Sequence, residues 1–196
     1  MIKVLYIDCC IRREESRTRL LAEAFLSELQ CKEGYQVERL CLMDEPLAPL
    51  TEGFFAQRER LLAADMRDHS RFRYAHQFSQ ADRVVIAAPF WDLGFPALLK
   101  LYIENICVDG ITFGANETGV FGLCKAKRLL FLTTRGGDYS SSPLEMGARY
   151  LEALSEFWGI PRFDAVSADG LDLGLEPVRT ILNRAIEVAL GLVENF

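Results

Sequence analysis

The fold is decided by the stretch RVVIAAPFWDLGFP, residues 83–96. Residues 83–88 form a short run rich in β-branched side chains, as expected for a strand buried on both faces of a parallel sheet. Apolar side chains then recur at helical spacing over residues 96–106, and Pro96 suits the first turn of a helix. A strand, an aromatic loop and a helix follow one another, and ligands bind at such junctions in open α/β sheets.

The rest of the chain repeats this alternation. Residues 35–42 alternate apolar and polar side chains, which indicates a half-exposed strand at the edge of the sheet, and residues 111–121 indicate a small hairpin. Five strands separated by helices predict an α/β fold with a doubly wound, five-stranded parallel sheet and helices on both faces. Strands are expected at residues 2–7, 35–42, 83–88, 127–134 and 163–167, and helices at residues 16–29, 52–63, 66–79, 96–106, 143–158 and 177–193.

Composition narrows the class of protein. The 196 residues, 50% of them hydrophobic, favour one globular domain over residues 1–196. A net charge of −6 argues against a nucleic-acid partner, because neutralising phosphates requires clustered lysine and arginine. No apolar run approaches the roughly 20 residues of a membrane helix. Residues 1–5 lack the pattern of a signal peptide, so we expect a cytoplasmic protein without a membrane partner.

Metal and thiol chemistry find little support in the sequence. The six cysteines lack C-x-x-C spacing, so reduced thiols are expected. A disulfide between the adjacent Cys9 and Cys10 would be strained. The two histidines, His69 and His76, lie in a polar region, which argues against a histidine-centred metal site or catalytic triad. We therefore expect no metal.

Residues 43–80 form a long excursion before the third strand. Two prolines break the chain there, and two charged helical segments follow. The excursion is nevertheless aromatic. Its rings either pack these helices onto the sheet or face a second subunit or the mouth of a ligand site. The aromatic residues are Phe54, Phe55, Phe72, Tyr74 and Phe78.

Three loops at strand ends are candidates for binding a ligand, and none contains a dinucleotide-binding fingerprint or a P-loop. In the first, Ser16 and Thr18 stand at the start of a helix with Arg12 nearby. Hydroxyls and free N–H groups at a helix N-terminus suit a phosphate monoester, although Ser16 as a simple N-cap explains the same pattern. The three loops are residues 8–18, 89–95 and 134–139.

The other two loops offer flat rings and backbone donors. Phe90 and Trp91 suit the border of a planar heterocycle, or else pack in the core. Gly136 and Gly137 let the backbone approach a ligand closely and present N–H groups, or else form an ordinary turn. Taken together, the three loops fit a mononucleotide with a planar ring, above all FMN.

An ordered set of motifs resembles the FMN-dependent NAD(P)H azoreductase and quinone reductase family over essentially the whole chain. The resemblance implies a flavodoxin-like fold, a homodimer with active sites near the subunit interface, and ping-pong reduction of a quinone, azo or nitro compound by NADH or NADPH. It implies flavin-centred chemistry without a catalytic side chain. The motifs are residues 88–93, 96–100, 110–113, 122–123 and 133–137.

The resemblance also assigns residues to FMN. The phosphate is expected against Cys10, Arg12, Ser16, Arg17 and Thr18. The isoalloxazine ring is expected along Pro89, Phe90, Trp91, Asp92 and Leu93. Its pyrimidine edge is expected near Thr134, Arg135, Gly136, Gly137 and Tyr139. Family members often carry serine in place of Cys9, Cys10 and Thr134, and asparagine in place of Asp92.

Two alternatives to an enzyme remain open at this point. A flavodoxin-type electron carrier would bind FMN without a pocket for nicotinamide, and a flavodoxin-like interaction protein would have lost FMN. The chain length, the helical excursion over residues 52–79 and the hairpin over residues 111–121 favour the enzyme, because these segments can roof a substrate cleft.

Overall fold

The computed structural model describes all residues from Met1 to Phe196. A five-stranded sheet runs through its middle in the order β2-β1-β3-β6-β7, and all four neighbouring pairs are parallel. The α/β class and the five main strands are thereby confirmed. The strands are β1 (Ile2–Asp8), β2 (Tyr35–Cys41), β3 (Arg83–Ala87), β6 (Leu129–Thr134) and β7 (Phe163–Ala168).

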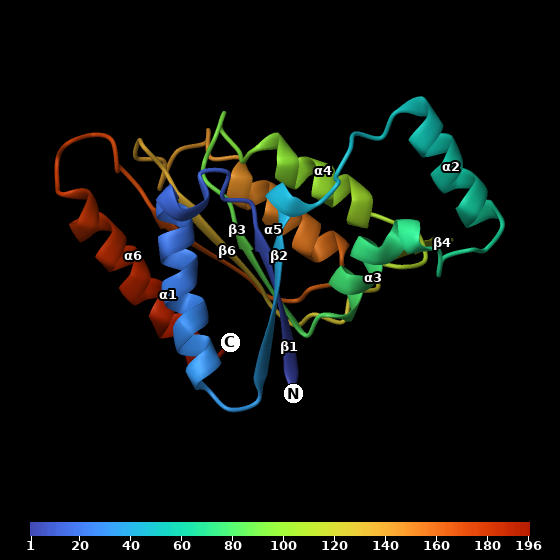
Figure 1. Ribbon diagram of the computed structural model, residues 1–196, viewed down its shortest axis with the longest axis horizontal. Coiled ribbons are helices and arrows are strands. Elements are labelled where there is room, and N and C mark those ends of the chain that lie inside the picture. Colours follow the sequence, from blue (N-terminus) through green and yellow to red (C-terminus); the bar gives the residue numbers. More distant parts are fainter.

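Helices cover both faces of the sheet (Figure 1). One face carries α1 (Arg17–Cys31) and α6 (Val178–Val193), and the other carries α3 (Arg73–Gln80), α4 (Ala97–Ile106) and α5 (Gly147–Phe157). Successive side chains of a strand point to opposite faces. In β3, Val85 and Ala87 therefore belong to one core, and Val84 and Ile86 belong to the other. This arrangement explains why residues 83–88 read as continuously apolar.

The strand order places a crevice at the carboxyl end of the sheet. From β1 the chain passes outward to β2 and then returns to pair β3 with the other side of β1. The loops that leave β1 and β3 therefore run to helices on opposite faces, α1 and α4. Ligands of open α/β sheets bind at this type of switch point.

The excursion before β3 differs from its prediction in one respect. Helix α2 (Glu52–Ala63) has the expected bounds, but the second helical segment begins with a 3-10 turn at Ser70–Phe72 and continues as α3. The chain has reversed just before it, where Asp65 adopts a φ of 55°. His69 then starts the turn by accepting a hydrogen bond from the Arg71 N–H. The helical pattern of residues 66–69 is therefore overridden by the turn after α2.

The aromatic side chains of the excursion divide into a buried and an exposed group, so packing onto the sheet is confirmed for the buried ones and a contact with a second subunit or a ligand stays a prediction for the exposed ones. Phe72 and Phe78 are buried, whereas Phe54 and Phe55 are exposed on α2, a helix without a buried residue that lies out from the sheet in Figure 1. The expected hairpin forms a separate antiparallel pair, β4 (Phe113–Asn116) and β5 (Gly119–Gly122). No helix combines the length and the apolar character needed to cross a membrane.

Candidate cofactor site

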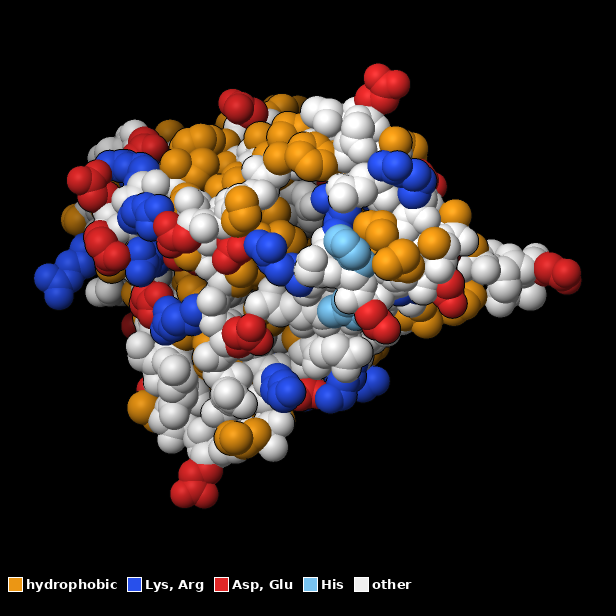
Figure 2. All heavy atoms as spheres, turned by 45° about the vertical axis from the view of Figure 1, so that its right-hand side comes forward, with side chains coloured by type: hydrophobic (Ala, Val, Ile, Leu, Met, Phe, Trp, Pro, Cys, Tyr) orange, Lys and Arg blue, Asp and Glu red, His pale blue; other side chains and the backbone are white.

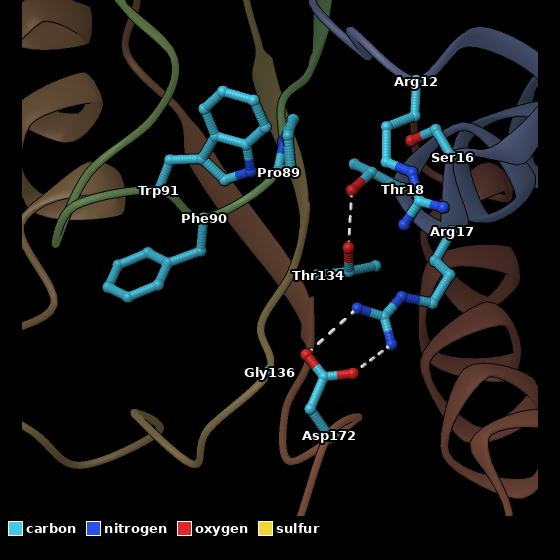
Figure 3. A pocket seen from close by; sticks show the side chains of 10 residues that line it. All are labelled: Arg12, Ser16, Arg17, Thr18, Pro89, Phe90, Trp91, Thr134, Gly136 and Asp172. Atoms are coloured by element: carbon cyan, nitrogen blue, oxygen red, sulfur yellow. Dashed lines mark hydrogen bonds and ion pairs between the residues drawn. The ribbon is translucent and has the colours of Figure 1, made fainter.

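A cavity of about 150 Å³ lies at the carboxyl ends of β1, β3 and β6 (Figure 3). Nine of its ten lining residues come from the three loops that the sequence singled out, and the tenth follows β7. The fold therefore brings these loops together. The lining residues are Arg12, Ser16, Arg17, Thr18, Pro89, Phe90, Trp91, Thr134, Gly136 and Asp172.

Thr134 ties the three loops to one another. Its hydroxyl lies 2.6 Å from the hydroxyl of Thr18, which joins the end of β6 to the start of α1. Its carbonyl accepts a hydrogen bond of 3.1 Å from the Phe90 N–H, which joins the same point to the aromatic loop. Both threonine side chains are buried. These buried hydrogen bonds of Thr134 therefore fix the distances between the three loops.

The start of α1 provides a binding site for an anion. Ser16 caps the helix by accepting a hydrogen bond from the Arg19 N–H at 3.3 Å, and it also lines the cavity, so the two interpretations of this serine are compatible. The N–H groups of Arg17 and Thr18 have no acceptor within the protein. Arg12 lines the same end of the cavity. Free N–H groups at a helix N-terminus beside guanidinium groups suit a phosphate.

The aromatic loop contains a tight turn. Trp91 and Gly94 each donate a backbone hydrogen bond to the other, at 3.2 and 2.8 Å. Between them, Asp92 and Leu93 have φ values of 50° and 67°, so both lie in the left-handed region, as in a type I′ hairpin turn. Their N–H groups have no acceptor within the protein. Neither residue lines the cavity itself, and the turn presents two free backbone donors beside it.

Leucine is rarely found in the left-handed region, where a side chain costs roughly 1–2 kcal/mol. We expect the variant Leu93→Gly to be more stable than Leu93→Ala by about 1 kcal/mol, because both remove the same side chain and glycine alone is unstrained there. Thermal unfolding of the two variants measures this difference. At Leu173, an exposed leucine outside the left-handed region, the order of glycine and alanine should be reversed. Equal stability of the two Leu93 variants would contradict the strain.

The third loop presents backbone donors as well. The N–H groups of Gly136 and Gly137 have no acceptor, while their carbonyls accept hydrogen bonds from Asp172 and Gly170 at 2.9 and 3.0 Å. The loop is thus anchored through its carbonyls. A Cβ atom at Gly136 would lie 2.4 Å from an oxygen of Asp172, and one at Gly137 would lie 3.0 Å from the ring of Tyr139. Glycine at these positions allows the close packing of this loop.

The side chain of Arg135 is held by two ion pairs outside the cavity. Its side chain is 5% exposed, and it forms ion pairs of 3.1 Å with both Glu145 and Asp169. Its guanidinium lies 5.4 Å from the ring centroid of Phe90. Arg135 does not line the cavity, because two buried carboxylates hold its guanidinium behind the aromatic wall, and the expected contact between this residue and a ligand stays a prediction. Tyr139 also lies behind this wall, with its ring 4.6 Å from that of Phe90.

Cys10 is likewise absent from the cavity. Its side chain is buried among apolar residues, and its thiol donates to the carbonyl of Ala87 at 3.7 Å. The expected contact between Cys10 and a phosphate stays a prediction. Burial, together with the charge of Asp8, raises the pKa of Cys9 to about 12 and also raises the pKa of Cys10. All six cysteines are free, and no cluster of side chains is arranged to hold a metal ion.

These thiols should be inert in the folded protein, because the thiolate is the reactive form. On brief treatment with iodoacetamide at pH 8, we expect the exposed Cys31 to be alkylated while Cys9 and Cys10 remain unmodified. Peptide mass mapping measures the alkylation, and the same treatment in denaturant should modify all three. Alkylation of Cys9 or Cys10 as fast as Cys31 under native conditions would contradict their burial.

Comparison with known proteins agrees with this geometry. The family model for the flavodoxin-like fold matches residues 2–191. FMN-dependent NADH:quinone oxidoreductase 2 from Clostridium acetobutylicum is 41% identical over 201 residues, and 100% of each chain is covered. The chain belongs to this flavodoxin-like oxidoreductase family. The resemblance inferred from the ordered motifs is thereby confirmed.

Other members of this oxidoreductase family are similar over the same length. An FMN-dependent NADH:quinone oxidoreductase from Clostridium perfringens is 36% identical over 198 residues, with 100% of both chains covered. Among solved structures, an azoreductase from Bacillus anthracis is 27% identical and has a TM-score of 0.89, again with 100% of both chains covered. The match therefore includes all the loops around the cavity.

The sequence did not identify Asp172, Glu145 or Asp169 as parts of this site. Asp169 and Asp172 follow β7, whose carboxyl end lies at the same edge of the sheet as those of β1, β3 and β6. Their place after a strand was therefore the available signal. Glu145 carried no such signal, because its part depends on the buried position of Arg135.

Proposed function

We propose that this protein is an FMN-dependent NADH:quinone oxidoreductase that also accepts azo compounds. The observation that carries the proposal is the cavity at the switch point, where a helix N-terminus with free N–H groups, an aromatic wall and a glycine loop face one another. The 41% identity to an enzyme of that name, over the full length of both chains, supports the same activity.

The residues present fit FMN. We assign its phosphate to the end of the cavity formed by Arg12, Ser16, Arg17 and Thr18, two of which carry unpaired N–H groups at the start of α1. We assign its ring system to the side formed by Pro89, Phe90 and Trp91. When bound, FMN supplies the chemistry of hydride transfer.

The chain itself contributes fixed donors. We propose that the N–H groups of Gly136 and Gly137 stabilise the negative charge that reduction places on the pyrimidine side of the ring, as preorganised donors do elsewhere. We propose that an N–H group of the turn at Asp92 and Leu93 donates a hydrogen bond to the reactive nitrogen of the ring, because both of these N–H groups are unpaired. Arg135 acts as a positioning residue, because it contacts both carboxylates and Phe90 but not the cavity.

An enzyme is favoured over the two alternatives from the sequence. The curated relatives are named as oxidoreductases with NADH as donor, which neither an electron carrier nor an interaction protein requires. The proposal predicts NADH consumption that depends on added FMN and on an acceptor such as a benzoquinone or a carboxylated azo dye. A steady-state assay of NADH or NADPH consumption tests it. Consumption that is no faster with any of these acceptors than without one would refute it.

We further propose a homodimer in which a second copy of the chain covers exposed apolar side chains. Phe54 and Phe55 on α2 are 45% and 51% exposed, and that helix packs against the rest of the protein through Leu61 and Leu62 without a fully buried residue. Trp91 and Met146, near the cavity, are exposed as well. Figure 2 turns the side of the molecule that carries α2 toward the viewer, and apolar side chains gather there on the upper part and beside the two histidines. Such patches are typical of subunit interfaces.

Sedimentation analysis tests the dimer. The double variant Phe54→Ser/Phe55→Ser should shift the protein toward monomer, because it removes the largest apolar side chains of α2. Val188→Ser, an exposed apolar position on α6 at the other face of the sheet, should leave the mass unchanged. A monomeric wild-type protein at micromolar concentration would refute the proposal.

The free cysteines lead us to propose a reducing compartment, the cytoplasm, as the location.

A further inference from the structure

One ion pair spans the cavity between two distant parts of the chain (Figure 3). Arg17, the first residue of α1, donates to both carboxylate oxygens of Asp172, at 2.7 and 3.3 Å. Asp172 lies on the loop between β7 and α6, and both residues line the cavity. The pair is therefore part of the site and not a contact elsewhere on the surface.

Asp172 is held in this position by its backbone. Its N–H donates to the carbonyl of Gly136 at 2.9 Å, and the preceding residue, Leu171, donates to the carbonyl of Arg135 at 3.1 Å. The carboxylate lies against Gly136, where a Cβ atom would come within 2.4 Å of it. The hydrogen bond from Arg17, with a further contribution from the charge of Arg12, lowers the pKa of Asp172. The cavity is thus lined by a fixed negative charge at neutral pH.

The carboxylate of Asp172 is paired with Arg17, a guanidinium that a bound phosphate would also need. Of the two guanidinium groups that line the cavity, Arg17 is paired with Asp172 and Arg12 is paired with the exposed Glu15 at 3.2 Å. No lysine lines the cavity. A phosphate at the start of α1 would bring up to two further negative charges near Asp172. It would therefore have to compete with a carboxylate for Arg17.

We propose that Asp172 is an internal competitor for the phosphate of FMN and thereby sets the affinity and the exchange rate of the cofactor. In the free protein Asp172 holds Arg17, and on binding the guanidinium turns from the carboxylate to the phosphate. Asp172 is an affinity-determining residue and takes no part in hydride transfer. The inference rests on the proposed function, because it requires FMN in this cavity.

The test compares two flavins that differ in the phosphate alone. The protein is freed of flavin and titrated with FMN and with riboflavin, and binding is followed by flavin fluorescence. For Asp172→Asn we expect the Kd for FMN to fall by about three- to tenfold, as for relief of one like-charge contact at a partly exposed site. The Kd for riboflavin should stay within about twofold, and release of FMN should be slower.

Glu176→Gln is the matched control. It makes the same change from carboxylate to amide on the same loop, outside the cavity, in a residue paired with Arg184 at 2.7 Å. Its affinities for both flavins should equal those of the wild type. Asp172→Ser removes the same charge with a smaller side chain and should reproduce the preference for FMN if Asp172→Asn folds poorly.

Three results would overturn the inference while leaving the proposed function intact. The first is weaker FMN binding in both Asp172 variants, which would mean that Asp172 holds Arg17 in place for the phosphate. The second is an equal change in the Kd for FMN and for riboflavin, and the third is no change in either Kd. Failure of the wild-type protein to bind either flavin would overturn the proposed function, and the inference with it.

Discussion

Replacing Gly137 with tryptophan is expected to weaken FMN binding by at least about a hundredfold, a loss of roughly 2.7 kcal/mol or more. A side chain at this position starts 3.0 Å from the ring of Tyr139, which packs on Phe90. An indole there would take the space beside the aromatic wall and cover the free N–H groups of the glycine loop. Titration of the flavin-free variant with FMN, followed by fluorescence, measures the loss.

Gly191→Trp serves as the control for Gly137→Trp. Gly191 lies in α6, and a Cβ atom added there would have no neighbouring atom within 4 Å, so the same substitution should leave FMN binding unchanged. Circular dichroism should show both variants folded. Full FMN affinity in a folded Gly137→Trp protein would mean that the glycine loop does not contact the cofactor.

Replacing Arg135 with methionine should lower the free energy of unfolding by about 3–5 kcal/mol, because removing one member of a buried ion pair leaves uncompensated charge. Here two carboxylates would be left, Glu145 and Asp169, whose side chains are 10% and 15% exposed. Methionine keeps much of the apolar contact with Phe90, so the loss reports mainly on charge. Urea unfolding of the wild type and the variant measures it.

An exposed ion pair provides the comparison for Arg135. Arg184 pairs with Glu176 at 2.7 Å, and both side chains are about half exposed, so Arg184→Met should cost less than about 1 kcal/mol. The Arg135 variant should also bind FMN more weakly, because the loops behind the aromatic wall lose their common partner. A loss below about 1 kcal/mol in Arg135→Met would contradict the positioning role of this residue.

The fold was predictable where local pattern and tertiary packing agree. Residues 83–88 read as a doubly buried strand because both faces of β3 are covered, and α4 follows at Ala97 after Pro96. The prediction was less accurate where a single side chain decides the boundary. Helix α5 begins at Gly147, later than Pro143 suggests, and Glu145 accepts a hydrogen bond from the Ala148 N–H at its start.

For the site, position in the chain was more informative than residue type. The three loops could be located because parallel strands end at one edge of the sheet. This is true whichever side chains the loops carry. Side-chain direction could not be predicted in the same way. Cys10 lies just after β1 and turns into the core, and Arg135 follows β6 directly and turns to Glu145 and Asp169. Asp172 enters the cavity through a loop whose path depends on its hydrogen bond to Gly136.

The central claim, that the cavity at the switch point holds an FMN reduced by NADH, is tested most directly by rapid mixing of the FMN-loaded protein with NADH in the absence of oxygen. We predict complete two-electron bleaching of the flavin absorbance at a rate that saturates with NADH, followed by recovery when a quinone is added. Bleaching no faster than that of free FMN at the same concentration would contradict it.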